Sequence, residues 1–342
     1  MTRLALARHR GPGFFTRQST PHLFALPSLR KTQVRAANQG ESYPQILRKI
    51  PYSPDELMNL TFRRGKLEDA EACGAICFQA FKTVAEAYHF TPDFPSADMP
   101  VELLSWMLGH AGFYGVVAEL GGRVVGSNFL DERNGIAGVG PITVDPSVQN
   151  KAIGRQLMED VQHRAAQQNF PGVRLVQAGY HVRSLSLYAK LGYDVREPLA
   201  CLQGPALNDV MAGYGVRPAA AGDLDACNRV CRRVHGHDRG GELLDAIGQG
   251  AATVVEHDGR ITGYATTIGF FGHAVGESNR ELQALIGAAP TFAGAGFLLP
   301  TRNTELFRWC LQRGLRVTQP MTLMSFGLYN EPAGAFLPSV AY

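Results

Sequence analysis

Long apolar runs are missing from this 342-residue sequence, and a helix that spans a membrane needs about 20 consecutive apolar residues. Cysteine is also scarce, with six residues in all, too few for a chain of this length to be held by a disulfide framework. We therefore expect no membrane partner and a reducing compartment. The expected location is the cytoplasm, with organelle targeting as a minor alternative.

The cysteines do not form the pattern of a metal site. Cys73 and Cys77 are four residues apart in a segment that we expect to be helical, and so are Cys227 and Cys231. This spacing could supply half of a metal site, but no matching His or Cys pair lies nearby in the sequence. We expect these cysteines to pack in the core, and we expect no metal.

Acidic residues are absent before Glu41. Residues 1–57 hold nine basic and three acidic residues, so they carry +6 and the remainder carries −3 of the net charge of +3. A body that is not basic does not indicate a nucleic-acid partner. Residues 1–57 are a disordered extension, a targeting segment, or the product of a start codon upstream of a functional start at Met58. We expect a basic, disordered extension without a part in catalysis.

A candidate anion site is present in "VDPSVQNKAIGRQLM", residues 144–158, which we interpret as the end of a strand, a turn and the start of a helix. The first turn of a helix has unpaired N–H groups and a positive dipole end, so it binds phosphate. Gly154 and Ala152 keep the turn open to a phosphate, and Lys151 and Arg155 add positive charge. An ordinary strand, turn and helix without a ligand is the alternative. A P-loop would need Gly-Lys-Ser/Thr, which this turn does not supply.

A second motif follows in "VRLVQAGYHVRSLSLYAKLGYDV", residues 173–195, where Gly192 ends a helix. Together the two segments resemble the GNAT superfamily of acyl-CoA-dependent N-acyltransferases, over about residues 60–203. The family's Gln/Arg-x-x-Gly-x-Gly/Ala turn corresponds to residues 149–154, and its "LYxxLGF" helix end corresponds to residues 187–193. Ala152 stands where the first loop glycine is usual, and His181 stands where many members have an Asn.

The resemblance implies an acetyl-CoA site. In the family, the strand before the turn contacts pantetheine through its backbone, and the turn holds the pyrophosphate. The implied cofactor-binding residues are Ile142, Thr143, Val144, Gln149, Asn150, Lys151, Ala152, Ile153, Gly154, Arg155 and His181. The resemblance also places Tyr188 near the thioester sulfur as the catalytic acid, because a phenol is normally neutral at pH 7. A packed helix aromatic is the alternative for this tyrosine.

The sequence offers several candidates for the general base. Asp131 and Glu132, at the end of the preceding strand, are candidates, with surface turn residues as the alternative interpretation. Asp145 is expected to cap the turn. His181 could act through water, and a chain of water molecules could serve instead.

The acceptor is set in this family by the first two helices, here residues 77–108. That segment is rich in aromatic rings, so it indicates either an aromatic-lined acceptor pocket or simple helix packing. The rings belong to Phe78, Phe81, Tyr88, His89, Phe90, Phe94 and Trp106.

An internal repeat is indicated by three pairs of similar segments in the same order, and the chain is long enough for two domains. The pairs are residues 63–81 with 216–234, 116–127 with 253–264, and 181–195 with 303–317. Arg123 matches Arg260 and His181 matches Asn303. The second copy is degenerate, because it has no Gln-x-x-Gly-x-Gly turn and carries Cys310 where the first copy carries Tyr188.

We therefore expect an α+β fold (mixed α/β) of two tandem GNAT-like domains, each a mixed, mostly antiparallel sheet flanked by helices. The expected limits are residues 1–57 for the extension, 58–205 for the GNAT domain with its acetyl-CoA site, and 213–342 for the degenerate domain. We expect the degenerate domain to be structural, shaping the substrate cleft or docking another chain, with a second catalytic site as the alternative.

The expected function is acetyl-CoA-dependent N-acyl transfer, in which an amine of a small molecule or peptide attacks the acetyl group directly. Acetyl-CoA is the expected co-substrate, and the chain is expected to be a monomer or homodimer. The alternative is a non-catalytic CoA-binding or scaffolding pseudo-enzyme. Turnover of acetyl-CoA with an amine distinguishes the two.

Overall fold

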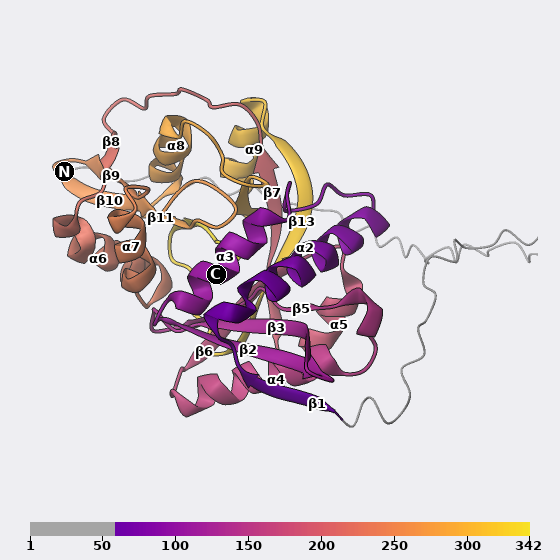
Figure 1. The fold of residues 1–342 in the computed structure, drawn as a ribbon. Coiled ribbons are helices and arrows are strands. Elements are labelled where there is room, and N and C mark those ends of the chain that lie inside the picture. The colour runs from indigo at the N-terminus through magenta and orange to yellow at the C-terminus, as the bar shows by residue number, and fades with distance from the viewer. Residues whose placement is uncertain (1–58) are drawn as a thin grey trace, which may run out of the picture. The chain divides into compact units, whose positions relative to one another are not determined.

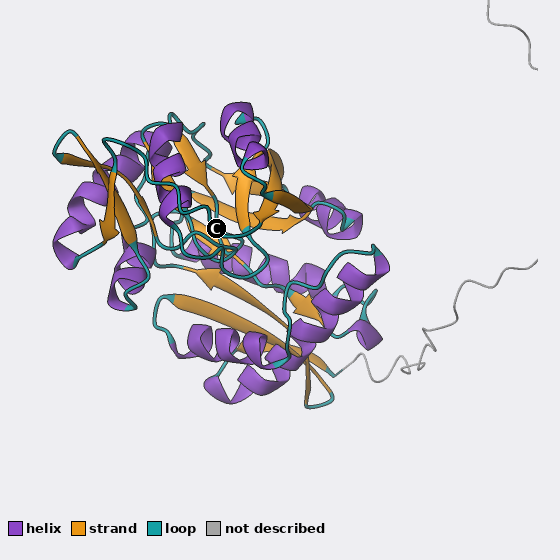
Figure 2. Ribbon diagram, turned by 90° about the horizontal axis from the view of Figure 1, so that it is seen from above, coloured by secondary structure: helices purple, strands orange, loops and turns teal. Residues whose placement is uncertain are grey.

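The computed structural model describes residues 59–342, which belong to one compact unit. The extension expected for residues 1–57 and the start expected at Met58 lie outside the described residues. The described chain alternates helices with strands, and its sheets are flanked by helices (Figure 2).

The first half of the described chain carries seven strands and four α-helices, with two short 3-10 turns. In chain order these are β1 (Leu60–Arg64), η1 (Leu67–Asp69), α2 (Ala70–Ala87), α3 (Asp98–Gly109), β2 (Phe113–Leu120), β3 (Arg123–Asp131), β4 (Ala137–Val139), β5 (Thr143–Val144), η2 (Pro146–Val148), α4 (Ile153–Gln167), β6 (Gly172–Ala178), α5 (Val182–Lys190) and β7 (Asp194–Gln203).

The second half repeats this order of elements. It contains β8 (Gly215–Pro218), η3 (Ala221–Asp223), α6 (Leu224–His235), α7 (Gly240–Gly248), β9 (Thr253–His257), β10 (Arg260–Ala265), β11 (Ala274–Gly276), α8 (Asn279–Ala288), β12 (Phe297–Pro300), α9 (Thr304–Gln312), β13 (Arg316–Gly327) and β14 (Ala335–Leu337). Within residues 59–342, only β5, η2 and β14 have no counterpart in the other half.

Two sheets hold these strands. The larger sheet has the order β1-β2-β3-β4-β6-β13-β7-β12, with β5 paired to β3, and the smaller has the order β14-β11-β10-β9-β8. All pairings of these strands are antiparallel except that of β4 with β6. The expected class of mixed α/β fold with mostly antiparallel sheets flanked by helices is confirmed.

The two halves exchange strands within the larger sheet. β13, from the second half, lies between β6 and β7 of the first half, and β7 pairs on its other side with β12. Figure 1 shows β13 beside β7. β7 and β13, which are equivalent in the repeat, thus each pair with the strand that lies two elements before the other. The limits expected for the two domains, residues 58–205 and 213–342, stay a prediction, and one continuous sheet crosses them.

The repeat extends to an ion-pair network that our sequence analysis missed. In the first half, Arg63 pairs with Asp69 at 2.7 Å and with Glu119 at 2.7 Å. In the second half, Arg217 pairs in the same way with Asp223 and Glu256, again at 2.7 Å in both pairs. Each aspartate also accepts a backbone N–H three residues before it, at 2.8 Å. The same three side chains thus tie the first strand to the start of the first helix in both halves.

The four cysteines of the repeated helices pack in the core, as predicted. Cys73 and Cys77 on α2, and Cys227 and Cys231 on α6, have no exposed side-chain surface. Burial raises the pKa of Cys73 to about 11, so its thiol stays neutral and unreactive.

The described part of the chain shows neither a metal-binding group nor a membrane span. Within residues 59–342, no group of three or more His, Cys, Asp or Glu side chains could hold a metal ion. No helix in the same residues is long and apolar enough to cross a membrane.

Candidate active site

A cavity opens where two parallel strands separate. β4 pairs with β6 only at Ala137–Val173 and Gly138–Arg174. Beyond that point the chain leaves β6, and β5 pairs with β3 instead. The strand expected before the turn is therefore short, since Pro141 has no N–H for a strand ladder and β5 spans only Thr143–Val144. The gap holds a cavity of about 320 Å³.

The turn at one side of this cavity leads into α4 in the way the sequence predicts. Ala152 precedes the helix with a left-handed backbone, φ 59° and ψ 9°, and its side chain makes no capping hydrogen bond. The amide of Gln156 donates to the carbonyl of Ala152 at 3.1 Å. The amides of Ile153, Gly154 and Arg155 stand in the first turn, where an α-helix has no internal acceptors for them, and all three residues line the cavity.

Gly154 is not required by the packing of the protein. A Cβ built at this position would meet only Val144 Cγ2, at 3.6 Å, which is an ordinary contact. Gly154 and Val144 both line the cavity. A phosphate that contacts backbone amides needs open space at the turn.

Eleven of the twelve residues implied by the resemblance line this single cavity. They are Ile142, Thr143, Val144, Gln149, Asn150, Ala152, Ile153, Gly154, Arg155, His181 and Tyr188. Lys151 lies in the same turn but does not line the cavity. The roles of all twelve residues stay predictions.

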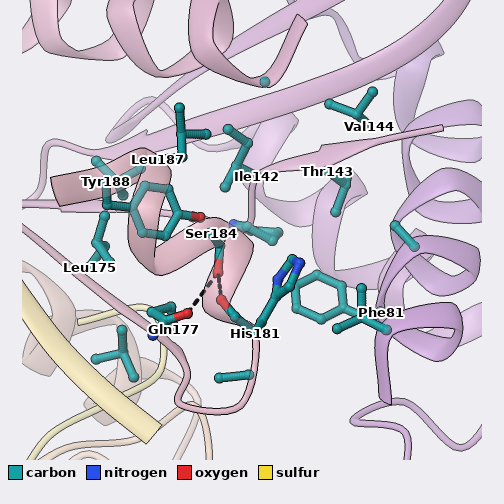
Figure 3. Close-up of a pocket in the computed structure, with 18 of the residues that line it drawn as sticks. Phe81, Ile142, Thr143, Val144, Leu175, Gln177, His181, Ser184, Leu187 and Tyr188 are labelled. Carbon is teal, nitrogen blue, oxygen red and sulfur yellow. Dashed lines mark hydrogen bonds between the residues drawn. The ribbon is translucent and has the colours of Figure 1, made fainter. Parts of the chain in front are cut away.

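Tyr188 reaches the cavity from α5. Its side chain is 6% exposed, and its ring packs edge-on against Tyr193 with 6.2 Å between the ring centroids. Figure 3 shows its hydroxyl among the side chains that line the cavity. Burial raises the pKa of Tyr188 above its usual value of 10.0, so the phenol keeps its proton at neutral pH.

The start of α5 joins the two sequence motifs. His181 is the N-cap of this helix, and burial together with nearby Arg183 lowers its pKa. Ser184 Oγ lies 2.7 Å from Gln177 Oε1 and 2.9 Å from the backbone oxygen of His181 (Figure 3). Arg183 donates to Gln149 Oε1 at 3.3 Å. Arg183, which our sequence analysis missed, thus adds a further positive charge beside the turn.

The acidic candidates for the general base do not line the cavity. Asp131 pairs with Arg133 at 2.6 Å, and Glu132 pairs with Arg164 at 2.6 Å. Asp145 accepts the backbone N–H of Ser147 at 2.9 Å, which confirms the expectation that it caps the turn.

The other part of the cavity lies between the first two helices and the second half of the chain. Of the aromatic side chains expected there, Phe81 and Phe94 line the cavity, and Phe90 stacks on Tyr180 with 4.2 Å between centroids. The sequence analysis missed Asp93, which also lines it. It also missed the lining residues of the second half, which are Phe270, Phe271, Met321, Val340 and Ala341.

In the second half, side chains cap the start of the corresponding helix, α8. Ser278, the N-cap of α8, accepts the N–H of Arg280 at 3.2 Å, and Glu281 accepts the N–H of Ser278 at 2.8 Å. Glu305 accepts a hydrogen bond from Asn279 Nδ2 at 3.0 Å beside it. Side chains of the chain itself therefore cap the start of α8, and Cys310 is fully buried on α9.

Comparisons with known proteins agree with this geometry. Residues 78–193 match the model of the Acetyltransferase (GNAT) family. A presumed acetyltransferase of Pyrococcus horikoshii has a similar structure, with a TM-score of 0.64 and 15% identity, over 81% of this chain and 94% of that chain. A GCN5-related N-acetyltransferase of Sphaerobacter thermophilus is similar with a TM-score of 0.51 and 16% identity, over 80% of this chain and 97% of that chain.

Both structural matches cover more of the chain than either half could supply alone, so the likeness in fold includes the second half. A search of curated proteins found no sequence that matches this chain. Residues 78–193 therefore form a segment that is similar to the acetyltransferase (GNAT) family.

Proposed function

We propose that this protein transfers the acetyl group of acetyl-CoA to an amine of a small molecule or peptide by direct attack. One observation carries the proposal: a helix start without a side-chain cap and a buried phenol line the same cavity, in the gap between two separating strands. The first feature suits a pyrophosphate and the second suits a leaving thiolate.

The residues of the cavity fit acetyl-CoA. The first-turn amides of α4 would hold the pyrophosphate with Arg155 and Arg183 beside them, and the space at Gly154 admits close contact. The backbone of residues 142–144, which faces the gap instead of β6, would accompany the pantetheine arm. The bound thioester supplies an activated acetyl group.

Proton transfers complete the reaction. The acceptor amine must lose a proton to become a nucleophile, and that proton passes to water or to a carboxylate in the cavity. The C–N bond then forms, the C–S bond breaks, and Tyr188 gives its proton to the departing sulfur. The nitrogen loses its second proton as the amide forms, and this proton restores the phenol directly or through water. A phenol whose pKa is raised by burial is still protonated at neutral pH, as a general acid must be.

Thermal unfolding with acetyl-CoA tests the binding half of the proposal. A ligand that binds only the folded state raises Tm as its concentration exceeds Kd. We expect acetyl-CoA to raise the Tm of the unaltered chain. Gly154→Glu should abolish this rise, because its carboxylate crowds the turn and repels phosphate. An unchanged rise in Gly154→Glu would remove the pyrophosphate assignment.

A thiol-release screen tests the catalytic half. The chain is incubated with acetyl-CoA and separate amines, amino acids and short peptides, and free CoA thiol is measured. Amine-dependent release supports the enzyme. Acetyl-CoA binding without release for any amine would favour the pseudo-enzyme alternative.

A further inference from the structure

The part of the cavity remote from the sequence motifs has an aromatic wall built from both halves of the chain. The rings of Phe81 and Phe94 meet edge-on with 5.9 Å between centroids. Phe94 in turn contacts Phe271, from the second half, with 6.3 Å between centroids. Met321 on β13 lines the same cavity. A substrate that enters here meets mainly apolar surface.

One acidic side chain interrupts this wall. Asp93, in the connection between α2 and α3, lines the cavity and accepts a hydrogen bond from Gln319 Nε2 at 2.9 Å. No lysine or arginine within residues 59–342 forms an ion pair with it. Burial raises the pKa of Asp93, and the hydrogen bond from Gln319 opposes this rise. A carboxylate in apolar surroundings lacks the compensation that a cation would provide.

Gln319 is held in the orientation that this hydrogen bond needs. Its side chain is only 3% exposed, and Tyr180 Oη donates to its Oε1 at 3.3 Å. Tyr180 is fixed by stacking on Phe90, with ring planes 9° apart. With its oxygen bound to the phenol, the amide presents its NH₂ group to Asp93. The chain Tyr180–Gln319–Asp93 therefore fixes the position of the carboxylate.

We infer that Asp93 recognises the ammonium group of an acceptor that carries this group on an aromatic or aliphatic body, held between Phe81, Phe94 and Phe271. This inference rests on the proposed function, because it names the acceptor for the same cavity. Arg183 supplies positive charge beside the phosphate turn, and Arg155 lies there in an ion pair with Glu159 at 2.7 Å. Asp93, in contrast, supplies negative charge beside β13. This difference in charge directs the anionic donor and the cationic acceptor to different parts of one cavity.

The second half of the chain gains a role from this inference. Gln319 reaches Asp93, 226 residues earlier in the sequence, because β13 is inserted between β6 and β7. Gln319 is a positioning residue, and Phe271 is part of the wall. The second half completes the acceptor site without binding a donor of its own.

Calorimetry with defined probes tests the inference on the full chain saturated with CoA. The probes are 2-phenylethylamine and n-hexylamine, and their neutral counterparts are 2-phenylethanol and 1-hexanol. We expect both amines to bind, and both alcohols to bind about tenfold or more weakly, because a hydrogen bond to a charged group is among the stronger ones. Spermidine, which has several charges and no apolar end, should bind more weakly than 2-phenylethylamine.

Two variants test whether the carboxylate of Asp93 binds the amines. Asp93→Asn should weaken the binding of the amines about tenfold or more and leave the binding of the alcohols unchanged. Asp98→Asn, at the exposed start of α3, is the matched control and should change neither. The comparison of amine with alcohol on the unaltered chain needs no variant, so it holds even if Asp93→Asn fails to fold.

Three outcomes would overturn the inference: alcohols that bind as tightly as amines, equal amine affinity in Asp93→Asn and the unaltered chain, or no amine binding when CoA is bound. Saturation with CoA is measured separately. Failure of the chain to bind CoA at all would therefore count against the proposed function and be recognised as such.

Discussion

At the scale of single residues, the turn before α4 adopts a backbone that its sequence does not favour. Ala152 has φ 59° and Asn150 has φ 72°. The left-handed region costs a residue with a Cβ roughly 1–2 kcal/mol, and asparagine tolerates it better than alanine does. In the family that this turn resembles, a glycine is usual at the position of Ala152. The positive φ of Ala152 explains why glycine suits this position.

Ala152→Gly is therefore expected to stabilise the protein by roughly 0.5–1 kcal/mol, the relief of strain less the entropy that glycine loses on folding. Urea unfolding monitored by circular dichroism measures the change. Asn150→Gly is the control and should gain less, because asparagine already accommodates a positive φ. A loss of stability in Ala152→Gly would show that the alanine methyl makes contacts worth more than the strain.

Tyr188 is the residue at which packing and catalysis can be separated. Tyr188→Phe keeps the ring that packs against Tyr193 and removes only the proton. We expect kcat to fall by roughly 10²-fold or more with KM for acetyl-CoA nearly unchanged, the pattern of an interaction made in the transition state. Cys310→Ala, at the matching position of the second half, should leave kcat near that of the unaltered chain. Full kcat in Tyr188→Phe would remove the general-acid role.

The same tyrosine predicts the alkaline side of the pH profile. A general acid loses activity as pH rises through its pKa, and burial places the pKa of Tyr188 above 10.0. Ionisation of this group should therefore not reduce kcat of the unaltered chain below about pH 10.

At the scale of elements, the starts of two equivalent helices differ in their capping. α4 begins after Ala152 without a side-chain cap, whereas α8 begins with Ser278 and Glu281 bound reciprocally to its first amides. The uncapped start leaves donors for a ligand, and the capped start uses them for stability. Absence of the glycine turn from the second half is thus matched by a change in capping chemistry.

Ser278→Ala should destabilise the chain by about 1 kcal/mol, as loss of an N-cap usually does. Chemical denaturation measures this loss, and the rise of Tm with acetyl-CoA should be unaffected, because α8 takes no part in the donor site. A smaller rise in this variant would indicate that the second half also binds the donor.

Local features could be predicted from the sequence, and distant pairings could not. The phosphate turn and the helix with Tyr188 each depend on neighbouring residues, whose capping and turn chemistry can be predicted from the local sequence. The repeat was visible because equivalent residues recur. The pairing of β13 with β6, and of Gln319 with Asp93, joins segments more than a hundred residues apart. Strand exchange leaves no periodic signal, so the acceptor end of the cavity was missed.

At the scale of the whole molecule, the two halves share one sheet. β13 pairs along both of its edges, with β6 on one side and β7 on the other. Removing the second half would expose one edge of β6 and both edges of β7, and it would uncover buried residues such as Leu199 and Leu202 on β7. Exposed apolar edges promote aggregation. The first half of the described chain is therefore expected to depend on the second half for its stability as well as for its acceptor site.

Two truncations compare this dependence with that of the basic N-terminal segment. A chain ending at residue 205 should express as insoluble protein or bind ANS strongly, since β6 and β7 lose the strand between them. A chain lacking residues 1–57 should stay soluble and keep the rise of Tm with acetyl-CoA, because the first strand begins only at Leu60. Gel filtration and thermal unfolding measure both. A soluble, monomeric chain of residues 58–205 that binds acetyl-CoA would contradict the shared-sheet interpretation, and loss of solubility on deleting residues 1–57 would show that this segment supports the fold.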